Sequence, residues 1–230
     1  MIKIGICDDE LAIHNQVKKY ILDKDFGEKI EIVSFLNGAD LLEYGDTIDI
    51  LLLDIVMPEM DGIDVGRLVS RQKNAPKIIM LTSMRERFKE AFEISAYRFV
   101  TKPIVQSELI QAILDAVKTF VGNSTVEVYR DSRKYGFQQK QIVYISKVQS
   151  RTEVIIGEKA YQSTYSLEDW EASLDERIFF RVHKSYIVNF SYIDRIEDKI
   201  YLTSEEILPV AKRRKNALMQ KYIQYDLEFR

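Results

Sequence analysis

The first half of this 230-residue sequence alternates, five times in succession, between a short apolar run and a segment whose apolar residues recur at helical spacing. The apolar runs predict strands at residues 3–7, 30–35, 49–54, 77–81 and 97–100. The other segments predict helices at residues 11–22, 39–44, 63–69, 87–94 and 105–120. Such alternation produces a parallel sheet covered by helices on both faces. We therefore expect a doubly wound, five-stranded parallel sheet, in which ligands bind beyond the carboxyl ends of the strands.

The pattern changes after the polar stretch Gly-Asn-Ser-Thr at residues 122–125, which is the best candidate for a linker. Short strand-like runs follow at residues 126–129, 136–138, 142–145, 153–156, 160–164, 192–196, 200–202 and 207–210. Ser166 opens a helix with a capping-box pattern in which Asp169 replaces the usual Glu, and residues 212–225 predict a terminal helix. One compact core serves about 100–150 residues. We therefore expect an α/β domain over residues 1–121, the linker, and a β-rich domain over residues 126–230.

Composition restricts the class of protein. Apolar residues make up 46% and charged residues 30%, a balance typical of soluble globular domains. No run of 18 apolar residues occurs, so we expect no membrane span, and the N-terminus lacks the features of a secretory signal. Cys7 is the only cysteine, which excludes an intrachain disulfide and fits a cytoplasmic location. The first half is acidic and the second mildly basic, which indicates different partners.

Three carboxylates converge on one edge of the predicted sheet. Asp54 ends an otherwise apolar run, and Asp8 and Asp9 directly follow the first predicted strand. Carboxylates gathered at one edge repel one another unless a cation binds between them, and oxygen-only ligands suit Mg²⁺. An acidic pair after a strand is, by itself, more often a helix cap. The Mg²⁺ prediction therefore depends on all three residues.

Two further strand ends carry polar side chains toward this edge. Thr82 follows the fourth predicted strand and Lys102 follows the fifth. A hydroxyl and an ammonium opposite a metal-bound carboxylate form a receptacle for a phosphoryl group. Asp54 would then act as a nucleophile and form an aspartyl-phosphate.

These motifs resemble those of response-regulator receiver domains. The matching segments are CDDE, LLLDIVMPEMDG, MLTS and FVTKP, within residues 1–120. The resemblance implies a flavodoxin-like fold with Asp54 as the phosphoacceptor. It also implies Asp9 as a direct Mg²⁺ ligand and Asp8 as a ligand through water. The backbone carbonyl of Val56 would complete the protein's share of the ligands.

The same resemblance assigns roles to residues of the last two strands. Thr82 would contact the phosphoryl group, Lys102 would pair with it, and the peptide bond between Lys102 and Pro103 would be cis. Phe99 would be the switch aromatic whose rotamer couples to Thr82. A core aromatic on a strand is an equally good interpretation of Phe99.

Two apolar positions distinguish this sequence. Val56 lies two residues after the phosphoacceptor, and Met84 lies two residues after Thr82. In receiver domains these side chains flank the path of the hydrolytic water. Neither side chain can orient a water molecule by hydrogen bonding, and both would exclude it. We therefore expect slow self-dephosphorylation.

Basic residues cluster at three places in the second half: within FFRVHKSYIVN from residue 179, within KRRK at residues 212–215, and between Lys147 and Arg151. Basic residues on loops suit DNA phosphates and guanine edges. Each cluster alone is more often a solvated face. Cations at the start of a helix also oppose its dipole, unless an anion binds there.

No adjoining pair of helices suggests a helix-turn-helix. The second half instead resembles the LytTR family of DNA-binding domains over about residues 125–230, through FFRVHKSYIVN, the I-x-x-I pattern at residues 193–196 and LPVAKRRK. The resemblance implies a β-rich fold that inserts loops into successive major grooves. By motif match the candidate DNA contacts are Lys184, Lys212 and Arg213. His183 and Arg151 are weaker candidates, because His183 also fits a packed or capping imidazole and the loop around Arg151 matches poorly.

We therefore expect a two-component response regulator. A sensor histidine kinase would phosphorylate Asp54, and the receiver surface formed by the fourth helix, fifth strand and fifth helix would then mediate homodimerisation. The paired second domains would bind double-stranded promoter DNA. Such a protein is a transcription factor and not an enzyme.

Two alternatives remain open. Haloacid-dehalogenase-type phosphatases also use an Asp nucleophile with Mg²⁺ and a Lys, but they need a second Asp where this chain has Val56. The other alternative is a receiver fused to an RNA- or protein-binding output module. Specific duplex binding with a steep salt dependence would separate the DNA-binding function from this alternative.

Overall fold

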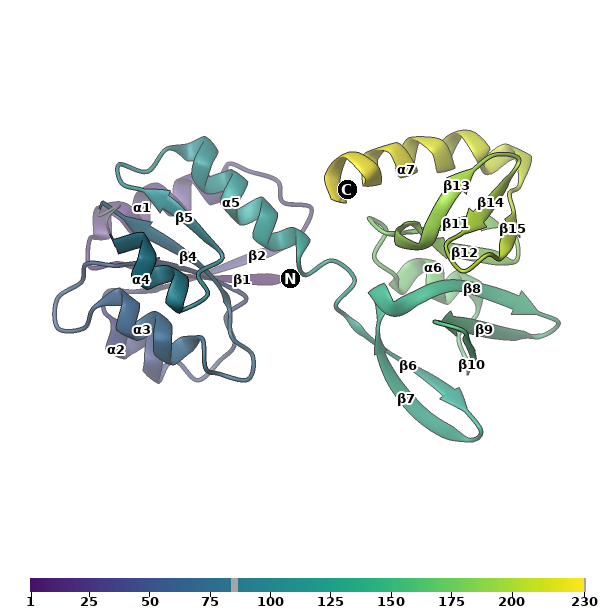
Figure 1. The fold of residues 1–230 in the computed structure, drawn as a ribbon, viewed down its shortest axis with the longest axis horizontal. Helices are drawn as coiled ribbons and strands as arrows, with labels where there is room; N and C mark the ends of the chain where they lie inside the picture. Colours follow the sequence, from purple (N-terminus) through teal and green to yellow (C-terminus); the bar gives the residue numbers. More distant parts are fainter. Residues whose placement is uncertain (84–86, 230) are drawn as a thin grey trace. The chain divides into compact units, whose positions relative to one another are not determined.

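The computed structural model describes residues 1–83 and 87–229. The chain forms two compact units, Met1–Thr119 and Phe120–Arg230, each with its own sheets (Figure 1). The first unit is α/β and the second is rich in β-strands, as the sequence predicts. No helix in the described part of the chain is long and apolar enough to cross a membrane.

The first unit is built on five parallel strands: β1 (Ile2–Cys7), β2 (Ile30–Phe35), β3 (Ile50–Asp54), β4 (Lys77–Thr82) and β5 (Arg98–Thr101). The helices are α1 (Leu11–Leu22), α2 (Gly38–Glu43), α3 (Gly62–Val69), α4 (Phe88–Glu93) and α5 (Gln106–Lys118). The strand order is β2-β1-β3-β4-β5, with parallel pairing throughout. Figure 1 shows α1 and α5 on one face of this sheet and α2 and α3 on the other.

The central position of β3 explains the apolar run that precedes Asp54. All five residues of β3 are buried, because the strand lies between β1 and β4. A parallel strand that is covered on both faces needs apolar side chains on both. Asp54 is the last residue of β3, so its carboxylate lies at the carboxyl edge of the sheet.

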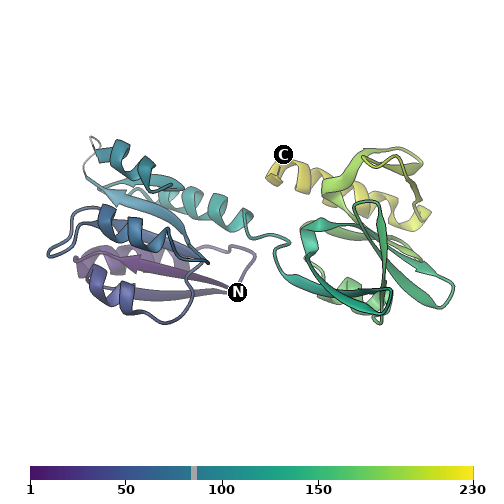
Figure 2. The same ribbon diagram turned by 60° about the horizontal axis from the view of Figure 1, so that its bottom comes forward.

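The second unit contains a seven-stranded sheet: β6 (Thr125–Arg130), β7 (Arg133–Gln138), β8 (Ile142–Val148), β9 (Arg151–Ile156), β10 (Lys159–Ser163), β11 (Phe179–His183) and β12 (Tyr186–Asn189). Their order is β11-β12-β8-β9-β10-β6-β7, and Figure 2 shows how strongly the strands curve. A three-stranded sheet comprises β13 (Ile193–Ile196), β14 (Lys199–Leu202) and β15 (Ile207–Pro209). The helical elements are α6 (Leu167–Ser173), the 3₁₀ turns η2 (Gln139–Gln141), η3 (Phe190–Tyr192) and η4 (Lys212–Arg214), and α7 (Lys215–Phe229).

The core of the second unit forms around two fully buried aromatic side chains, Trp170 on α6 and Phe190 after β12. The predicted capping box at the start of α6 is confirmed. The Asp169 amide donates to Ser166 Oγ at 3.1 Å, and the Ser166 amide donates to Asp169 Oδ2 at 2.9 Å. These two bonds fix the start of α6 and thereby the entry of Trp170 into the core.

Two elements differ from the sequence prediction. Residues 179–189, which the sequence singled out only for their basic side chains, form the β11–β12 hairpin. The predicted terminal helix begins later than expected, because residues 212–214 form the turn η4 and the helix starts at Lys215. The Ala211 amide donates to the Val182 carbonyl of β11 at 3.0 Å, which holds the chain out of helical geometry at this point.

Gly122, which we predicted to lie in the linker, packs within the second unit. Its φ of 67° lies in the left-handed region that favours glycine. Its amide donates to Asp175 Oδ2 at 3.3 Å, and a Cβ atom at this position would lie 2.6 Å from Ile178 Cδ1. Both the backbone conformation and the available space therefore require glycine here.

Candidate functional site

The three predicted carboxylates lie together at the carboxyl edge of the first sheet. β1 and β3 are neighbours in register, with Cys7 opposite Leu53, so Asp8 and Asp54 follow at adjacent strand ends. One carboxylate oxygen from each of Asp8, Asp9 and Asp54 lies within 4.8 Å of the other two. Asp8 and Asp54 are buried, whereas Asp9 is exposed.

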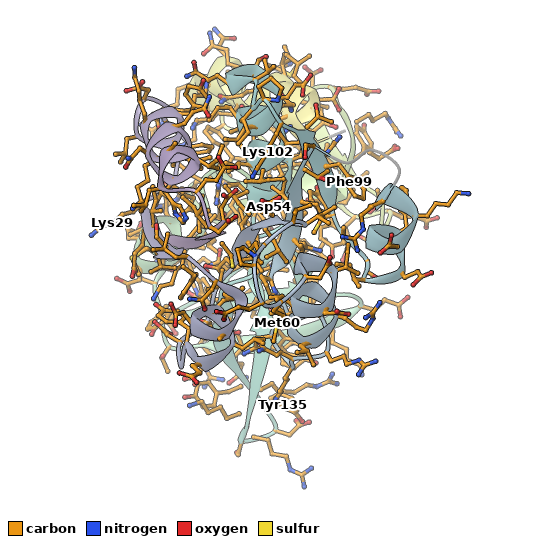
Figure 3. The ribbon with its side chains drawn as sticks, turned by 90° about the vertical axis from the view of Figure 1, so that its left-hand side faces the viewer. Lys29, Asp54, Met60, Phe99, Lys102 and Tyr135 are labelled. Atoms are coloured by element: carbon orange, nitrogen blue, oxygen red, sulfur yellow. The ribbon has the colours of Figure 1, made fainter. Side chains whose placement is uncertain are left out.

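Lys102 supplies positive charge to this cluster. It follows β5, and its Nζ lies 2.7 Å from Asp54 Oδ2 and 2.8 Å from Asp8 Oδ2. Figure 3 shows Lys102 and Asp54 side by side near the centre of the unit. The peptide bond between Lys102 and Pro103 is cis, as the resemblance implies.

Burial and ion pairing shift the pKa values of Asp54 and Lys102 in opposite directions. Burial raises the pKa of Asp54, and the hydrogen bond from Lys102 offsets only part of that rise. Burial alone would lower the pKa of Lys102, but its hydrogen bonds to Asp54 and Asp8 outweigh that effect and the net pKa is raised. Lys102 is therefore held in its charged form, while the charge of the Asp54 carboxylate is only partly compensated.

This donor set fits a hard divalent cation such as Mg²⁺. All three side chains offer carboxylate oxygens, which Mg²⁺ prefers over nitrogen or sulfur ligands. Lys102 faces these three carboxylates and lies 3.5 Å from a fourth, that of Glu10, so the pocket favours an additional cation. The exposed Asp9 leaves the cluster accessible from solvent.

Gly62, which the sequence analysis did not single out, determines how closely α3 approaches the end of β3. Its amide donates to the Ile55 carbonyl at 2.8 Å. A Cβ atom on Gly62 would lie only 1.8 Å from the Asp54 carbonyl oxygen. Asp61 caps the same helix by accepting from the Ile63 amide at 2.8 Å. The Asp-Gly pair after the apolar run was the available sequence signal.

Two of the three predicted basic segments, those containing Arg151 and Lys184, lie at neighbouring hairpin turns of the second unit. β8 pairs with β12, and the Lys147 amide donates to the Ser185 carbonyl at 2.9 Å. The β8–β9 turn before Arg151 therefore lies beside the β11–β12 turn that carries Lys184. Both Arg151 and Lys184 are exposed.

The third basic segment is held against β11 by hydrogen bonds. Besides the bond between Ala211 and Val182, Arg214 Nη1 donates to the Arg181 carbonyl at 2.8 Å. Lys212 and Arg213 lie between these two attachment points, and their side chains are exposed. The structure thus brings the three basic segments to one end of the second unit.

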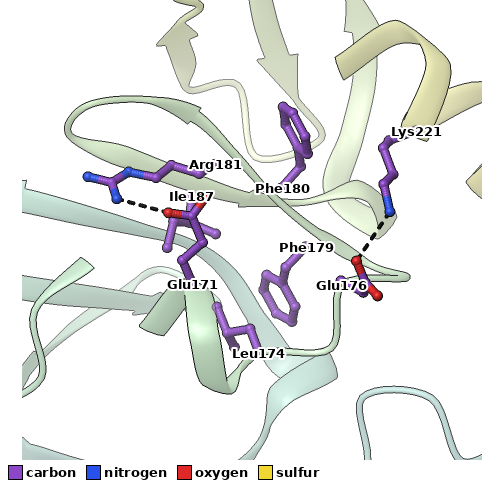
Figure 4. Close-up of a pocket in the computed structure, with 8 residues that line it drawn as sticks. All are labelled: Glu171, Leu174, Glu176, Phe179, Phe180, Arg181, Ile187 and Lys221. Carbon is purple, nitrogen blue, oxygen red and sulfur yellow. Dashed lines mark hydrogen bonds and ion pairs between the residues drawn. The ribbon is translucent and has the colours of Figure 1, made fainter. Parts of the chain in front are cut away.

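His183 and Arg181 have roles within the fold. His183 is half-buried, accepts from the Ser185 amide at Nδ1 (3.3 Å) and lies against the Tyr186 ring. Arg181 pairs with Glu168 at 2.7 Å and Glu171 at 2.9 Å. Arg181 lines a hollow of about 200 Å³ beside α6, and Figure 4 shows its guanidinium paired with Glu171. Arg181 is therefore neutralised within the domain.

Two family models match the chain. The response regulator receiver domain matches residues 4–114, and the LytTr DNA-binding domain matches residues 132–223. The chain is a LytTR-type response regulator. The first match falls within the α/β unit, and the second falls within the β-rich unit.

Two curated relatives match this response regulator over most of their length. The transcriptional regulatory protein LytR of Staphylococcus aureus (strain bovine RF122 / ET3-1) is 27% identical over 224 residues, which cover 90% of each chain. The transcriptional regulatory protein YpdB of Escherichia coli O6:H1 is 25% identical over 213 residues, covering 85% of this chain and 86% of the relative. Among solved structures, the response regulatory domain of mrkE from Klebsiella pneumoniae is 30% identical, with a TM-score of 0.47, and covers 51% of this chain and 96% of its own.

The predicted switch residues of the regulator, Thr82 and Phe99, lie on the paired strands β4 and β5. Thr82 is buried at the end of β4, where its carbonyl accepts from the Lys102 amide at 2.8 Å. Phe99 lies on β5 with its ring 5.4 Å from that of Phe92. Coupling between Thr82 and Phe99 stays a prediction, as does the Val56 carbonyl as a metal ligand. Met84 lies outside the described residues.

Proposed function

We propose that a sensor histidine kinase transfers a phosphoryl group to Asp54, and that the phosphorylated regulator dimerises and binds promoter DNA. The position of Lys102 carries this proposal, because its Nζ lies 2.7 Å from Asp54 and 2.8 Å from Asp8. An ammonium at this point can pair with the oxygens of an incoming phosphoryl group without leaving the pocket.

In the proposed transfer, an oxygen of Asp54 forms a bond to phosphorus while the bond between phosphorus and the donor's histidine nitrogen breaks. That nitrogen takes up a proton as it leaves. Lys102 neutralises charge on the phosphoryl oxygens, and the Thr82 hydroxyl contacts one of them. Mg²⁺, held by Asp8, Asp9, Asp54 and the Val56 carbonyl, would neutralise further charge on these oxygens when bound.

The proposed output is duplex DNA binding by the basic end of the LytTR domain. The exposed side chains of Lys184, Lys212 and Arg213 would contact phosphates and base edges. Arg151 and His183, at neighbouring hairpin turns, are secondary candidates. Phosphorylation would pair two regulators through α4, β5 and α5, so that two DNA-binding domains engage two half-sites. This proposal makes the protein a cytoplasmic transcription factor and not an enzyme.

The test treats the full chain with acetyl phosphate and MgCl₂ and follows its intact mass. The parent should gain one phosphoryl group and Asp54→Asn should gain none. Selection of bound genomic DNA with and without beryllofluoride should then enrich specific duplexes, whose affinity falls steeply with salt. An unaltered parent mass would contradict the phosphoacceptor assignment. Equal affinity for random duplexes and single-stranded RNA would contradict the promoter-binding assignment.

A further inference from the structure

His14 is a buried polar residue on α1 that none of the proposed steps uses. Only 2% of its surface is exposed, and its Nε2 lies 2.7 Å from the carbonyl oxygen of Asp8. A carbonyl oxygen can only accept, so Nε2 carries the hydrogen in this contact. Within the described residues, the other ring nitrogen, Nδ1, is buried without a hydrogen-bond partner. Keeping an unpaired polar atom in the core is costly, so the single bond that His14 makes calls for an explanation.

The hydrogen bond from His14 is one of four polar contacts that hold Asp8. Its amide donates to the Phe35 carbonyl at 3.2 Å, and its Oδ1 accepts from the Glu10 amide at 3.0 Å. Its Oδ2 pairs with Lys102 at 2.8 Å. The carbonyl is the one remaining polar group of Asp8, and His14 holds it from the inner face of α1. Each polar group of this residue therefore has a different partner, which for Oδ2 is an ion pair and not a hydrogen bond.

The neighbouring residue, Asp9, lacks such attachments. Its side chain is exposed, and in the described part of the chain no hydrogen bond or ion pair holds it. The Asp8 carbonyl and the Asp9 amide belong to one rigid peptide plane. The direction of that carbonyl therefore sets the position of the Asp9 Cα atom and the region that its carboxylate can reach.

We propose that His14 is a positioning residue for the divalent-cation site. By holding the Asp8 carbonyl, it keeps the Asp9 carboxylate within reach of Asp8 and Asp54, where oxygens of all three lie within 4.8 Å. This inference rests on the proposed function, in which these carboxylates bind Mg²⁺. Without the bond, the turn gains conformational freedom that must be lost again when the cation binds. The affinity for Mg²⁺ then falls even though the fold persists.

Three substitutions separate this role from simple packing. His14→Leu removes the donor and keeps apolar bulk in the core. His14→Gln restores a donor, because the glutamine amide nitrogen is separated from Cβ by the same number of bonds as Nε2 of histidine. Ile21→Ala is the matched control: Ile21 is buried on the same helix, 1% exposed, and lies further along it from the turn. It should lower stability by creating a cavity without freeing the turn.

The experiment titrates MgCl₂ into the full-length chain in a calorimeter. His14→Leu should bind Mg²⁺ at least about tenfold more weakly than the parent, as loss of an outer-shell partner does at other metal sites. His14→Gln should bind within a few-fold of the parent. Ile21→Ala should melt at a lower temperature with unchanged Mg²⁺ affinity. With acetyl phosphate as donor, His14→Leu should need more Mg²⁺ for half-maximal phosphorylation but reach the parent's rate at saturation.

Parent-like affinity in His14→Leu would overturn the inference while leaving the proposed function standing. An equal loss of affinity in Ile21→Ala would also overturn it, because lost stability would then explain the effect. A parent that binds no Mg²⁺ would instead overturn the metal site of the proposed function, and this inference with it. If His14→Leu does not fold, His14→Asn replaces it, since its amide is one bond closer to Cβ and falls short of the carbonyl. Equal affinities for the Asn and Gln variants would then overturn the inference.

Discussion

Among single residues, Lys102 supplies positive charge to the buried carboxylates at the carboxyl edge of the first sheet. It is the cation that pairs with both Asp8 and Asp54. We expect Lys102→Met to lower the free energy of unfolding by about 3–5 kcal/mol in EDTA, because it leaves buried carboxylates uncompensated. Added MgCl₂ should recover part of this loss. In the parent, where Lys102 supplies positive charge, removal of Mg²⁺ should change stability much less. Urea unfolding with and without MgCl₂ measures both effects, and equal sensitivity to EDTA in the two proteins would contradict this assignment.

Asp54 should make stability depend on pH in a defined direction. Burial raises its pKa above the ordinary value of 3.8, despite the hydrogen bond from Lys102. A group whose pKa is raised by folding stabilises the folded state at pH values below its pKa in the unfolded chain. This contribution is lost as the pH rises through its pKa in the folded state. The stability of Asp54→Asn relative to the parent should therefore increase as pH rises from about 4. Urea unfolding of both proteins across this range in EDTA would show it, and a constant difference would argue against the burial effect.

Gly62 is the residue at which the backbone itself limits substitution. Gly62→Ala would place a methyl group 1.8 Å from the Asp54 carbonyl oxygen, so α3 or the end of β3 must move. We expect a stability loss of at least about 1–3 kcal/mol, the range for overpacked cores, together with slower phosphorylation by acetyl phosphate. Gly45→Ala is the control, because nothing lies within 4 Å of the added methyl group there. Similar losses in both variants would point to a general effect of replacing glycine.

Among elements, η4 places a predicted DNA contact and a structural support on neighbouring residues. Arg213 is exposed, whereas Arg214 donates to the Arg181 carbonyl and pairs with Glu171 at 3.5 Å. Arg213→Ala should weaken specific DNA binding by about 1–3 kcal/mol if it reads a base, with no change in melting temperature. Arg214→Ala should lower stability by about 1 kcal/mol through the lost hydrogen bond. DNA titration and thermal melting of both variants test this, and a reversed pattern would exchange the two roles.

The sequence predicted the elements whose pattern is local. β3 was predictable because a strand buried on both faces is a continuous apolar run, and its terminal Asp54 marked the functional edge. Asp8, Asp9 and Lys102 followed from the topology of a parallel sheet. The β11–β12 hairpin was missed, because basic side chains interrupt its apolar alternation. The late start of α7 depends on the bond from Ala211 to Val182, a contact between distant segments that no local pattern reveals.

His14 and Gly62 were missed for a related reason. Both act through the backbone carbonyl of another residue, Asp8 and Asp54 respectively. Side-chain type and spacing predict which functional groups reach an edge of a sheet. They carry no information about which carbonyl a given side chain will meet. Residues that support a site through a backbone carbonyl can therefore be identified only from a three-dimensional structure.

At the scale of the whole molecule, activation should change the oligomeric state. We expect the full-length chain to sediment as a dimer in beryllofluoride and MgCl₂, because in the proposed function two receivers pair once the phosphoryl site is filled. Pairing two DNA-binding domains should raise affinity for a two-site duplex by roughly 10²–10⁴-fold, with little effect on a duplex that has one half-site. Asp54→Asn should show neither change. Sedimentation and DNA titration provide the measurement, and a monomer that gains the same affinity would exclude dimerisation as the switch.

The attachment of the η4 segment to β11 also bears on how such regulators diverge. Main-chain atoms and Arg214 hold the segment in place, so the outward side chains of Lys212 and Arg213 carry little of the domain's stability. If these side chains contact the operator as proposed, substitution at these two positions can alter operator preference while the scaffold is preserved. Duplicated copies of such a gene could acquire separate target promoters through very few codon changes, well before their folds differ measurably.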